Sequence, residues 1–323
     1  MKKSDIVLVF ILVAIVFSWA LYTNTPKGSI GSFNIQKERN EWSGRVNRDG
    51  PQQGYDEFVK ENAVRIPGFQ HSAAHLMGEV LYDTQGVSGV LFCDQSFAFG
   101  CYHGFFSIAI VTEGLNLVTK LDAQCLSLDK GKRSPCQHGI GHGVLQFLGY
   151  DHLNEALAEC DRTERLGPMN GCPTGVFMEY NLRVLEDENG SLIATPRPLD
   201  QKDPYIPCES IPDRYRLSCY HELPSWWSTV LENNYAAVGE LCTGISDPAI
   251  LSGCLASVGG VIADRSGFDV TTVERECNTM SSNQYRNYCL IGAAQTFSWG
   301  EDTAPLASTI CELADDLHGA QCP

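Results

Sequence analysis

The sequence predicts an all-α protein, an αα-solenoid of about seven helix-turn-helix repeats, each clamped by a local disulfide bond. Three observations indicate this fold. The cysteines fall into regularly spaced pairs, helical patterns precede the pairs, and turn-forming residues lie between the two members of a pair. A repeat of about 35 residues is the size of one helix-turn-helix unit in a stacked array.

Composition and charge narrow the class of protein. The chain has 323 residues, of which 43% are hydrophobic and 19% are charged, so it can bury a core. Its formal net charge is −16, and Lys and Arg form no cluster. Because binding to nucleic acid takes clustered cations, we expect no nucleic-acid partner. An acidic surface is more compatible with small ligands or cations.

The N-terminal segment predicts a membrane anchor. Lys2 and Lys3 precede an apolar run at residues 6–22. As a helix, this run is about 25 Å long, which is close to the roughly 30 Å of a bilayer core. We therefore expect residues 1–22 to cross the cell membrane once, with a cytoplasmic N-terminus and an extracytoplasmic remainder. The alternative is a signal peptide cleaved after residues 18–20.

The cysteines support an oxidising compartment outside the cytoplasm. There are fourteen, all after residue 90, and no C-x2-C spacing of the kind found in zinc clusters occurs. We therefore expect seven disulfides between neighbours in the sequence. The pairs are Cys93/Cys101, Cys125/Cys136, Cys160/Cys172, Cys208/Cys219, Cys242/Cys254, Cys277/Cys289 and Cys311/Cys322.

The spacing of these pairs defines the repeat. The two cysteines are eight residues apart in the first pair and 11 or 12 apart in the others. The first cysteines of successive pairs are 32, 35, 48, 34, 35 and 34 residues apart. The step of 48 indicates an insertion, assigned to residues 182–207, where Asn189-Gly190 predicts the turn of a small hairpin.

Each disulfide is predicted to join the end of one helix to the start of the next. Residues 153–160 illustrate the helical pattern before a pair, and residues 129–135 the turn-rich segment within one. Closing a loop of about a dozen residues stabilises the fold by roughly 3 kcal/mol. A glycine stands three residues after the second cysteine in four repeats, where it lets a neighbouring helix approach closely. These glycines are Gly104, Gly139, Gly175 and Gly292.

The cysteine rhythm and the Cys-x-x-Gly segments of residues 90–323 resemble a known family. They are similar to the disulfide-clamped Sel1-like, tetratricopeptide-related repeats of secreted cysteine-rich Helicobacter proteins. The spacing within a pair is longer here than is usual in that family. The resemblance implies a right-handed superhelix that presents a binding groove on its concave face, and it implies no reaction.

The predicted domain plan has three parts. Residues 1–22 form the anchor or signal peptide, residues 23–54 a flexible spacer, and residues 55–323 the helical repeat domain. The repeat domain begins with one or two lead-in helices at residues 55–84. Its last cysteine, Cys322, lies one residue from the end, so the final repeat is expected to be a truncated cap.

Six of the eight histidines lie between residues 71 and 152. Histidines four residues apart share one face of a helix, and this spacing occurs twice. Histidines two residues after a second cysteine occupy equivalent positions of successive repeats, so they are expected to be neighbours. The predicted metal ligands are His71, His75, Glu79, His103, His138 and His142.

Two functions are compatible with this cluster. Imidazole and carboxylate groups can bind Zn²⁺, Cu²⁺, Ni²⁺ or Fe²⁺, and histidines can also hold a haem from two sides. The alternative is a cell-surface scaffold whose concave face binds a protein or a glycan and whose histidines are purely structural. A structural role is the favoured interpretation for His152, His221 and His318.

Other chemistry has little support in the sequence. No zinc-protease, serine-hydrolase or phosphate-binding motif is present, so enzymatic activity remains an open question. Glu179 and Glu222 are candidate extra ligands or bases, although solvated or capping roles are the more usual ones. Trp226-Trp227 is expected to pack at a helix end rather than to line a groove.

Overall fold

The structure, a computed structural model, describes residues 35–65, 67–167, 171–186, 192–300 and 302–314. The predicted anchor at residues 1–22 lies outside the described residues. Among the described residues no single helix is long and apolar enough to cross a membrane. One pair of helices passes by length and composition together, Gly100–Glu113 with Leu115–Ser127, but it is bent by 119°.

In the part of the chain that the structure describes, fourteen α-helices, two short 3-10 helices and one two-stranded hairpin occur, which confirms the all-α class. The N-terminal helices are α2 (Ile35–Asp49), α3 (Pro51–Asn62) and α4 (Pro67–Gln85). The longer helices that follow are α5 (Gly100–Glu113), α7 (Lys130–Leu148), α9 (Gly171–Asn181), α10 (Asp213–Val230), α12 (Pro248–Arg265) and α14 (Asn283–Phe297). The shorter ones are η1 (Gly86–Phe92), η2 (Leu115–Leu117), α6 (Val118–Ser127), α8 (Leu153–Cys160), α11 (Tyr235–Thr243), α13 (Val270–Cys277) and α15 (Ala304–Glu312).

Helices α2 and α3 correct the prediction of a flexible spacer at residues 23–54, since residues 35–54 are almost entirely helical. Their few apolar side chains are buried. Trp42 of α2 lies edge-on against Phe58 of α3, with ring centroids 5.3 Å apart. Arg45 of α2 also forms an ion pair with Glu61 of α3 at 2.5 Å. Composition alone does not reveal these contacts.

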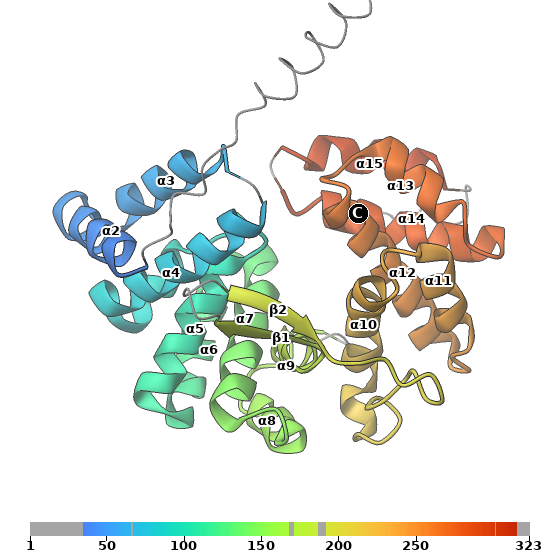
Figure 1. Cartoon of the computed structure of the whole chain (residues 1–323), viewed down its shortest axis with the longest axis horizontal. Helices are drawn as coiled ribbons and strands as arrows, with labels where there is room; N and C mark the ends of the chain where they lie inside the picture. Colours follow the sequence, from blue (N-terminus) through green and yellow to red (C-terminus); the bar gives the residue numbers. More distant parts are fainter. Residues whose placement is uncertain (1–34, 66, 168–170, 187–191, 301, 315–323) are drawn as a thin grey trace, which may run out of the picture. The chain divides into compact units, whose positions relative to one another are not determined.

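The long helices pack against one another in chain order, from α4 through α5, α7, α9, α10 and α12 to α14. The short helices pack against the long helices next to them in the chain. In Figure 1 the succession follows the colour gradient from blue to red. Helical repeats are therefore present. Each long helix packs against the long helix before it and the one after it, except α4 and α14 at the two ends of the series.

Six local disulfides are present among the described residues, and all six join the predicted partners. They are Cys93–Cys101, Cys125–Cys136, Cys160–Cys172, Cys208–Cys219, Cys242–Cys254 and Cys277–Cys289. Each of the six bonds is buried and forms part of the core. The predicted partner of Cys311, Cys322, lies outside the described residues.

The position of the second cysteine within its helix corrects one detail of the prediction. The expected position, at the start of the second helix, holds for Cys101 and Cys172, which are the second residues of α5 and α9. In the four other repeats the helix starts within the turn-rich segment, so the second cysteine lies about two turns inside it. These cysteines are Cys136, Cys219, Cys254 and Cys289.

Glycines allow the backbones of neighbouring long helices to touch. A Cβ atom on Gly104 would overlap the carbonyl of His75, one on Gly175 the carbonyl of His138, and one on Gly292 the carbonyl of Ala256. The predicted role of glycine three residues after the second cysteine is thus confirmed at these crossings. The fourth such glycine, Gly139, faces the Phe106 ring instead.

The insertion before α10 contains the predicted hairpin. Strand β1 (Leu182–Glu186) pairs antiparallel with β2 (Leu192–Pro196), with Leu182 opposite Pro196. Its turn at residues 189–190 lies outside the described residues. Trp226 and Trp227 of α10 are fully buried below this segment, and Trp226 Nε1 donates a hydrogen bond to the Arg197 carbonyl. The expectation that the two tryptophans pack is therefore confirmed.

Candidate metal centre

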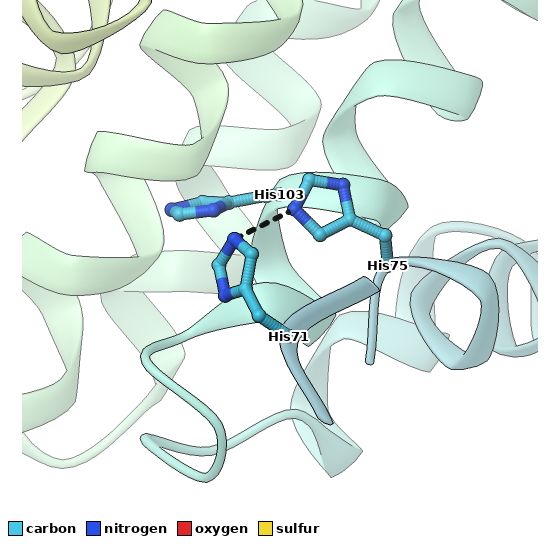
Figure 2. Close-up of side chains that lie close together, drawn as sticks. All are labelled: His71, His75 and His103. Atoms are coloured by element: carbon cyan, nitrogen blue, oxygen red, sulfur yellow. Dashed lines mark hydrogen bonds between the residues drawn. The ribbon is translucent and has the colours of Figure 1, made fainter. Parts of the chain in front are cut away.

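Three neighbouring helices bring together five of the six predicted ligands. His71 and His75 lie one turn apart on α4, and His138 and His142 lie one turn apart on α7. His103 on α5 lies between the two pairs, with its ring centroid 5.4 Å from His75 and 4.3 Å from His142. Figure 2 shows His103 facing the two histidines of α4. Helices α4 and α5 carry these side chains where their backbones touch at Gly104.

The five histidines form two sets that share one member. We call His71, His75 and His103 the first triad, and His103, His138 and His142 the second triad. In each triad, one ring nitrogen from every member lies within 4.8 Å of the others. These are the groups of potential metal ligands found in the described part of the chain.

Hydrogen bonds determine which ring nitrogens carry protons in the second triad. The Thr174 hydroxyl donates to the Gly171 carbonyl, so its oxygen accepts a hydrogen bond from His138 Nδ1 at 2.9 Å. His142 Nδ1 donates to Glu179 Oε2 at 2.8 Å. Glu179 is fully buried, and its other oxygen accepts a hydrogen bond from the Tyr150 hydroxyl at 2.5 Å. Both histidines therefore donate their Nδ1 hydrogen to an oxygen acceptor.

The consequence is a short contact between two ring nitrogens. With Nδ1 as the donor in both rings, the Nε2 atoms of His138 and His142 face each other 3.0 Å apart. Two bare nitrogens at this distance repel each other, so the contact needs a cation, either a proton shared between them or a metal ion. Burial lowers the pKa of His138 well below its usual value, which disfavours the proton on that ring.

A metal ion fits this arrangement. Two nitrogens about 2.0–2.1 Å from one ion, at an angle of about 90–109°, are separated by about 2.9–3.4 Å. The Nε2 atoms of His138 and His142 have this separation. The Glu179 carboxylate behind His142 matches the usual arrangement in which a carboxylate holds the second nitrogen of a metal-bound histidine.

In the first triad, His75 Nε2 can donate a hydrogen bond to His71 Nε2 (Figure 2). His71 Nδ1 donates to the Phe97 carbonyl at 2.8 Å, so its Nε2 is left as a lone pair, 3.1 Å from His75 Nε2. Burial lowers the pKa of His71, and lowers those of His75 and His103 well below the usual value. The three rings are therefore neutral, which is the protonation state that binds metals.

The loop that supplies the Phe97 carbonyl has an unusual backbone. Residues 97–99 all have positive φ angles, of 54°, 54° and 60°, although none is glycine. They lie inside the shortest disulfide loop, between Cys93 and Cys101. The disulfide holds this strained turn against α4, and the turn orients His71.

Cys172 has a role beyond the predicted disulfide. Its disulfide is present, but its backbone also takes part in the crossing of α7 and α9, where a Cβ atom on Gly141 would overlap the Cys172 carbonyl. Gly141 directly precedes His142, and the helix that begins beside Cys172 carries both Thr174 and Glu179. The disulfide of Cys172 therefore fixes the start of the helix that orients the second triad.

The sixth predicted ligand, Glu79, is not part of either triad. Its carboxylate forms an ion pair with Arg39 of α2, which also pairs with Asp83 at 3.2 Å. Although Glu79 follows His75 by four residues, its carboxylate is held by Arg39 of α2. The structure therefore assigns Glu79 to the contact between α2 and α4.

Other ionisable residues lie near the centre without joining it. The positive charge of His221 would lower the pKa of His138, and its own pKa is lowered to about 4 by burial. Asp264 raises the pKa of His71 by its negative charge. Burial raises the pKa of Glu222 to about 8. His152 is half exposed and pairs with Glu155, away from the triads, and His318 lies outside the described residues.

Sequence reasoning missed the groups that orient the ligands. Glu179 was expected to be solvated or capping, but it is completely buried in α9 against His142. One signal was available, because Glu179 is the lone charged residue within the apolar sequence of α9. Thr174 and the Phe97 carbonyl carry no comparable signal, since their role depends on how the helices pack.

The chain was compared with known proteins at three levels. No protein-family model, no curated protein and no solved structure matches it. The function is therefore argued from the residues and the geometry of the two triads.

Proposed function

We propose that this chain is a membrane-tethered, extracytoplasmic helical-repeat protein that binds a transition-metal ion through the histidines of α4, α5 and α7. One observation carries the proposal. The Nε2 atoms of His138 and His142 lie 3.0 Å apart, and both Nδ1 hydrogens are donated to Thr174 and Glu179. A buried cation is the group that this arrangement accepts.

The ligand set narrows the choice of metal. The cysteines beside the triads form disulfides and cannot bind a metal as thiolates, so imidazole nitrogens are the available ligands. Three neutral imidazoles suit Zn²⁺, Cu²⁺, Ni²⁺ or Fe²⁺ and leave at least one position for water or another ligand. Ca²⁺ and Mg²⁺ are disfavoured because they prefer oxygen ligands.

An ion fits the triads better than haem. The two axial ligands of a haem lie on opposite sides of the iron, which places their nitrogens about 4 Å apart. The paired nitrogens on α4 and on α7 are 3.1 Å and 3.0 Å apart and belong to side chains one turn apart on one helix. Such pairs occupy adjacent positions around an ion, so we propose an ion.

The location and the repeat type form part of the same proposal. An apolar run after two lysines and six buried disulfides support an anchored protein in an oxidising compartment. The succession of disulfide-clamped helix pairs supports a right-handed αα-solenoid similar to the Sel1-like repeats. The histidines lie at the N-terminal end of that array.

Metal analysis of the full-length chain in detergent tests the proposal. After metal removal and dialysis against Zn²⁺ or Cu²⁺, we expect bound metal by elemental analysis. The variant carrying both His138→Ala and His142→Ala should bind less metal than the wild-type chain, and the His152→Ala control should bind as much. If the wild-type chain binds no metal while its circular dichroism shows a folded protein, the metal proposal is wrong. The scaffold with structural histidines would then be favoured.

A further inference from the structure

His103 differs from its four histidine neighbours. Its side chain is buried, with 8% of the residue exposed, and it is the member shared by both triads. Among the described residues neither of its ring nitrogens has a hydrogen-bond partner, whereas His71, His138 and His142 each donate one Nδ1 hydrogen to oxygen. Both nitrogens of His103 therefore remain available as ligands.

We propose that the two triads bind two metal ions and that His103 bridges them through its two ring nitrogens. This inference rests on the proposed metal-binding function. The first ion would have His71, His75 and His103 as ligands, and the second ion His103, His138 and His142. When the second ion binds, His103 loses its remaining N–H proton to water and becomes an imidazolate. No oxidation state changes in this step.

The placement of the rings supports two ions rather than one. The rings of His71 and His75 are both 5.4 Å from that of His103, whereas those of His142 and His138 are 4.3 Å and 5.9 Å away. The five histidines do not form a single group whose nitrogens all lie within 4.8 Å of one another. The two nitrogens of one imidazole diverge from each other, so one ion cannot use both.

The surrounding charges offset the repulsion between two cations. An imidazolate would contribute one negative charge between the ions. Glu179 adds a second behind His142, at a distance of 2.8 Å from its Nδ1 atom. The second ion therefore has a carboxylate behind its triad as well as a share of His103.

The stoichiometry of metal binding separates the possible outcomes. Apo full-length chain in detergent is dialysed against Cu²⁺ and then analysed for metal and protein. We expect two ions per chain. One ion per chain would overturn the bridge and leave the proposed metal-binding function standing. No bound ion would overturn both.

Single variants test whether the two triads are separate sites. His75→Ala and His142→Ala should each bind one ion, because each removes a ligand of one triad. If the centre held a single ion, both variants would weaken the binding of that same ion. The wild-type chain would then already bind one ion, not two. The His152→Ala control should bind two ions.

Electron paramagnetic resonance tests the bridge itself. Two Cu²⁺ ions joined by an imidazolate couple magnetically, so the fully loaded wild-type chain should give a signal far weaker than two isolated ions. The singly loaded His75→Ala and His142→Ala variants should give the full signal of one ion. Two bound ions with a full, uncoupled signal in the wild type would overturn the bridge. This measurement does not depend on whether a His103 variant folds.

Discussion

Glu179 is the residue on which the orientation of the second triad depends. Its two oxygens accept hydrogen bonds from His142 and Tyr150, and its side chain is completely buried. A buried carboxylate that stabilises a metal-bound imidazole usually raises the affinity for the metal by a factor of about 10–100.

We therefore predict that Glu179→Gln weakens metal binding about 10–100-fold without unfolding the chain. The neutral amide keeps the shape of the side chain but loses the negative charge behind His142. Competition with a chelator of known affinity measures the change. Glu155→Gln, at an exposed ion pair with His152, is the matched control. An unchanged affinity in Glu179→Gln would contradict the role assigned to this residue.

A separate prediction concerns Glu222 and the pH dependence of the free energy of unfolding. Burial raises its pKa in the folded protein from 4.5 to about 8, so the folded state holds a proton that the unfolded state loses at a lower pH. The free energy of unfolding should therefore fall as the pH rises from about 4.5 to about 8. Over this pH range the free energy of unfolding of the wild-type chain should fall by roughly 3–5 kcal/mol more than that of the Glu222→Gln variant.

Denaturant titrations of both proteins across this pH range measure the difference. The Glu222→Gln variant should be the more stable protein at pH 8, and the two should be alike below pH 4.5. Glu209→Gln changes an exposed carboxylate on the preceding segment and serves as the control. A wild-type curve parallel to that of Glu222→Gln would show that Glu222 is not buried in the way described.

At the scale of elements, the crossings of the long helices hold the histidines in place. The His138 carbonyl touches the Cα of Gly175, and the His75 carbonyl occupies the same position on Gly104. A methyl group at either glycine has no space, because backbone atoms already fill it. The helices must then move apart, and the histidine that shares the crossing moves with them.

We predict that Gly175→Ala destabilises the fold by about 1–3 kcal/mol and weakens metal binding as well. Gly131→Ala is the control, because no atom lies within 4 Å of a Cβ built there and its backbone is already helical. It should be neutral or slightly stabilising. Thermal unfolding and chelator competition on both variants provide the comparison, and equal stability of the two would argue against a tight crossing.

A further prediction concerns the first disulfide loop and its effect on the first triad. Removing the Cys93–Cys101 bond with Cys93→Ser and Cys101→Ser releases the left-handed turn that holds the Phe97 carbonyl on His71. We expect weaker metal binding by His71 and His75 in this variant, measured by chelator competition.

The matched control removes the bond between Cys277 and Cys289, which lies in α13 and α14. By the loop-closure argument both variants lose a similar stability of roughly 3 kcal/mol. The control should keep the affinity of the wild type for metal. Equal affinity in both variants would show that the turn at residues 97–99 does not orient His71.

Some features could be predicted from sequence because they depend on short separations along the chain. The six disulfides follow from cysteines 8–12 residues apart, and the grouping of five histidines follows from equivalent positions in adjacent repeats. Helix α2 and the first turn of α3 were missed because contacts across the chain secure two polar segments, among them Trp42 with Phe58 and Arg45 with Glu61. Glu79 was misplaced because its ion pair with Arg39 joins residues 40 positions apart. The backbone contact of Cys172 was missed because it depends on how α7 crosses α9.

For the whole molecule, the proposed ions would connect three helices, the first ion joining α4 to α5 and the second joining α5 to α7. Ligand binding to the folded state raises the free energy of unfolding by about 2.7 kcal/mol when free metal is at 100 times its dissociation constant. We predict that adding Zn²⁺ raises the melting temperature of the wild-type chain and that a chelator reverses it. The variant with both His138→Ala and His142→Ala should show a smaller shift, because its first triad is intact. An equal shift in both proteins would mean that the metal acts elsewhere.

The crossing of α12 with α14 repeats the backbone contact of α4 with α5, but it carries no histidine. Ala256 takes the place of His75, and Ile291, just before Gly292, takes the place of His103. The same scaffold therefore exists with and without coordinating side chains in one polypeptide. Exchanging Ala256 and Ile291 for histidine would place two of the three histidines of a triad on a crossing with the same backbone contact, which makes this architecture a natural starting point for building new metal sites.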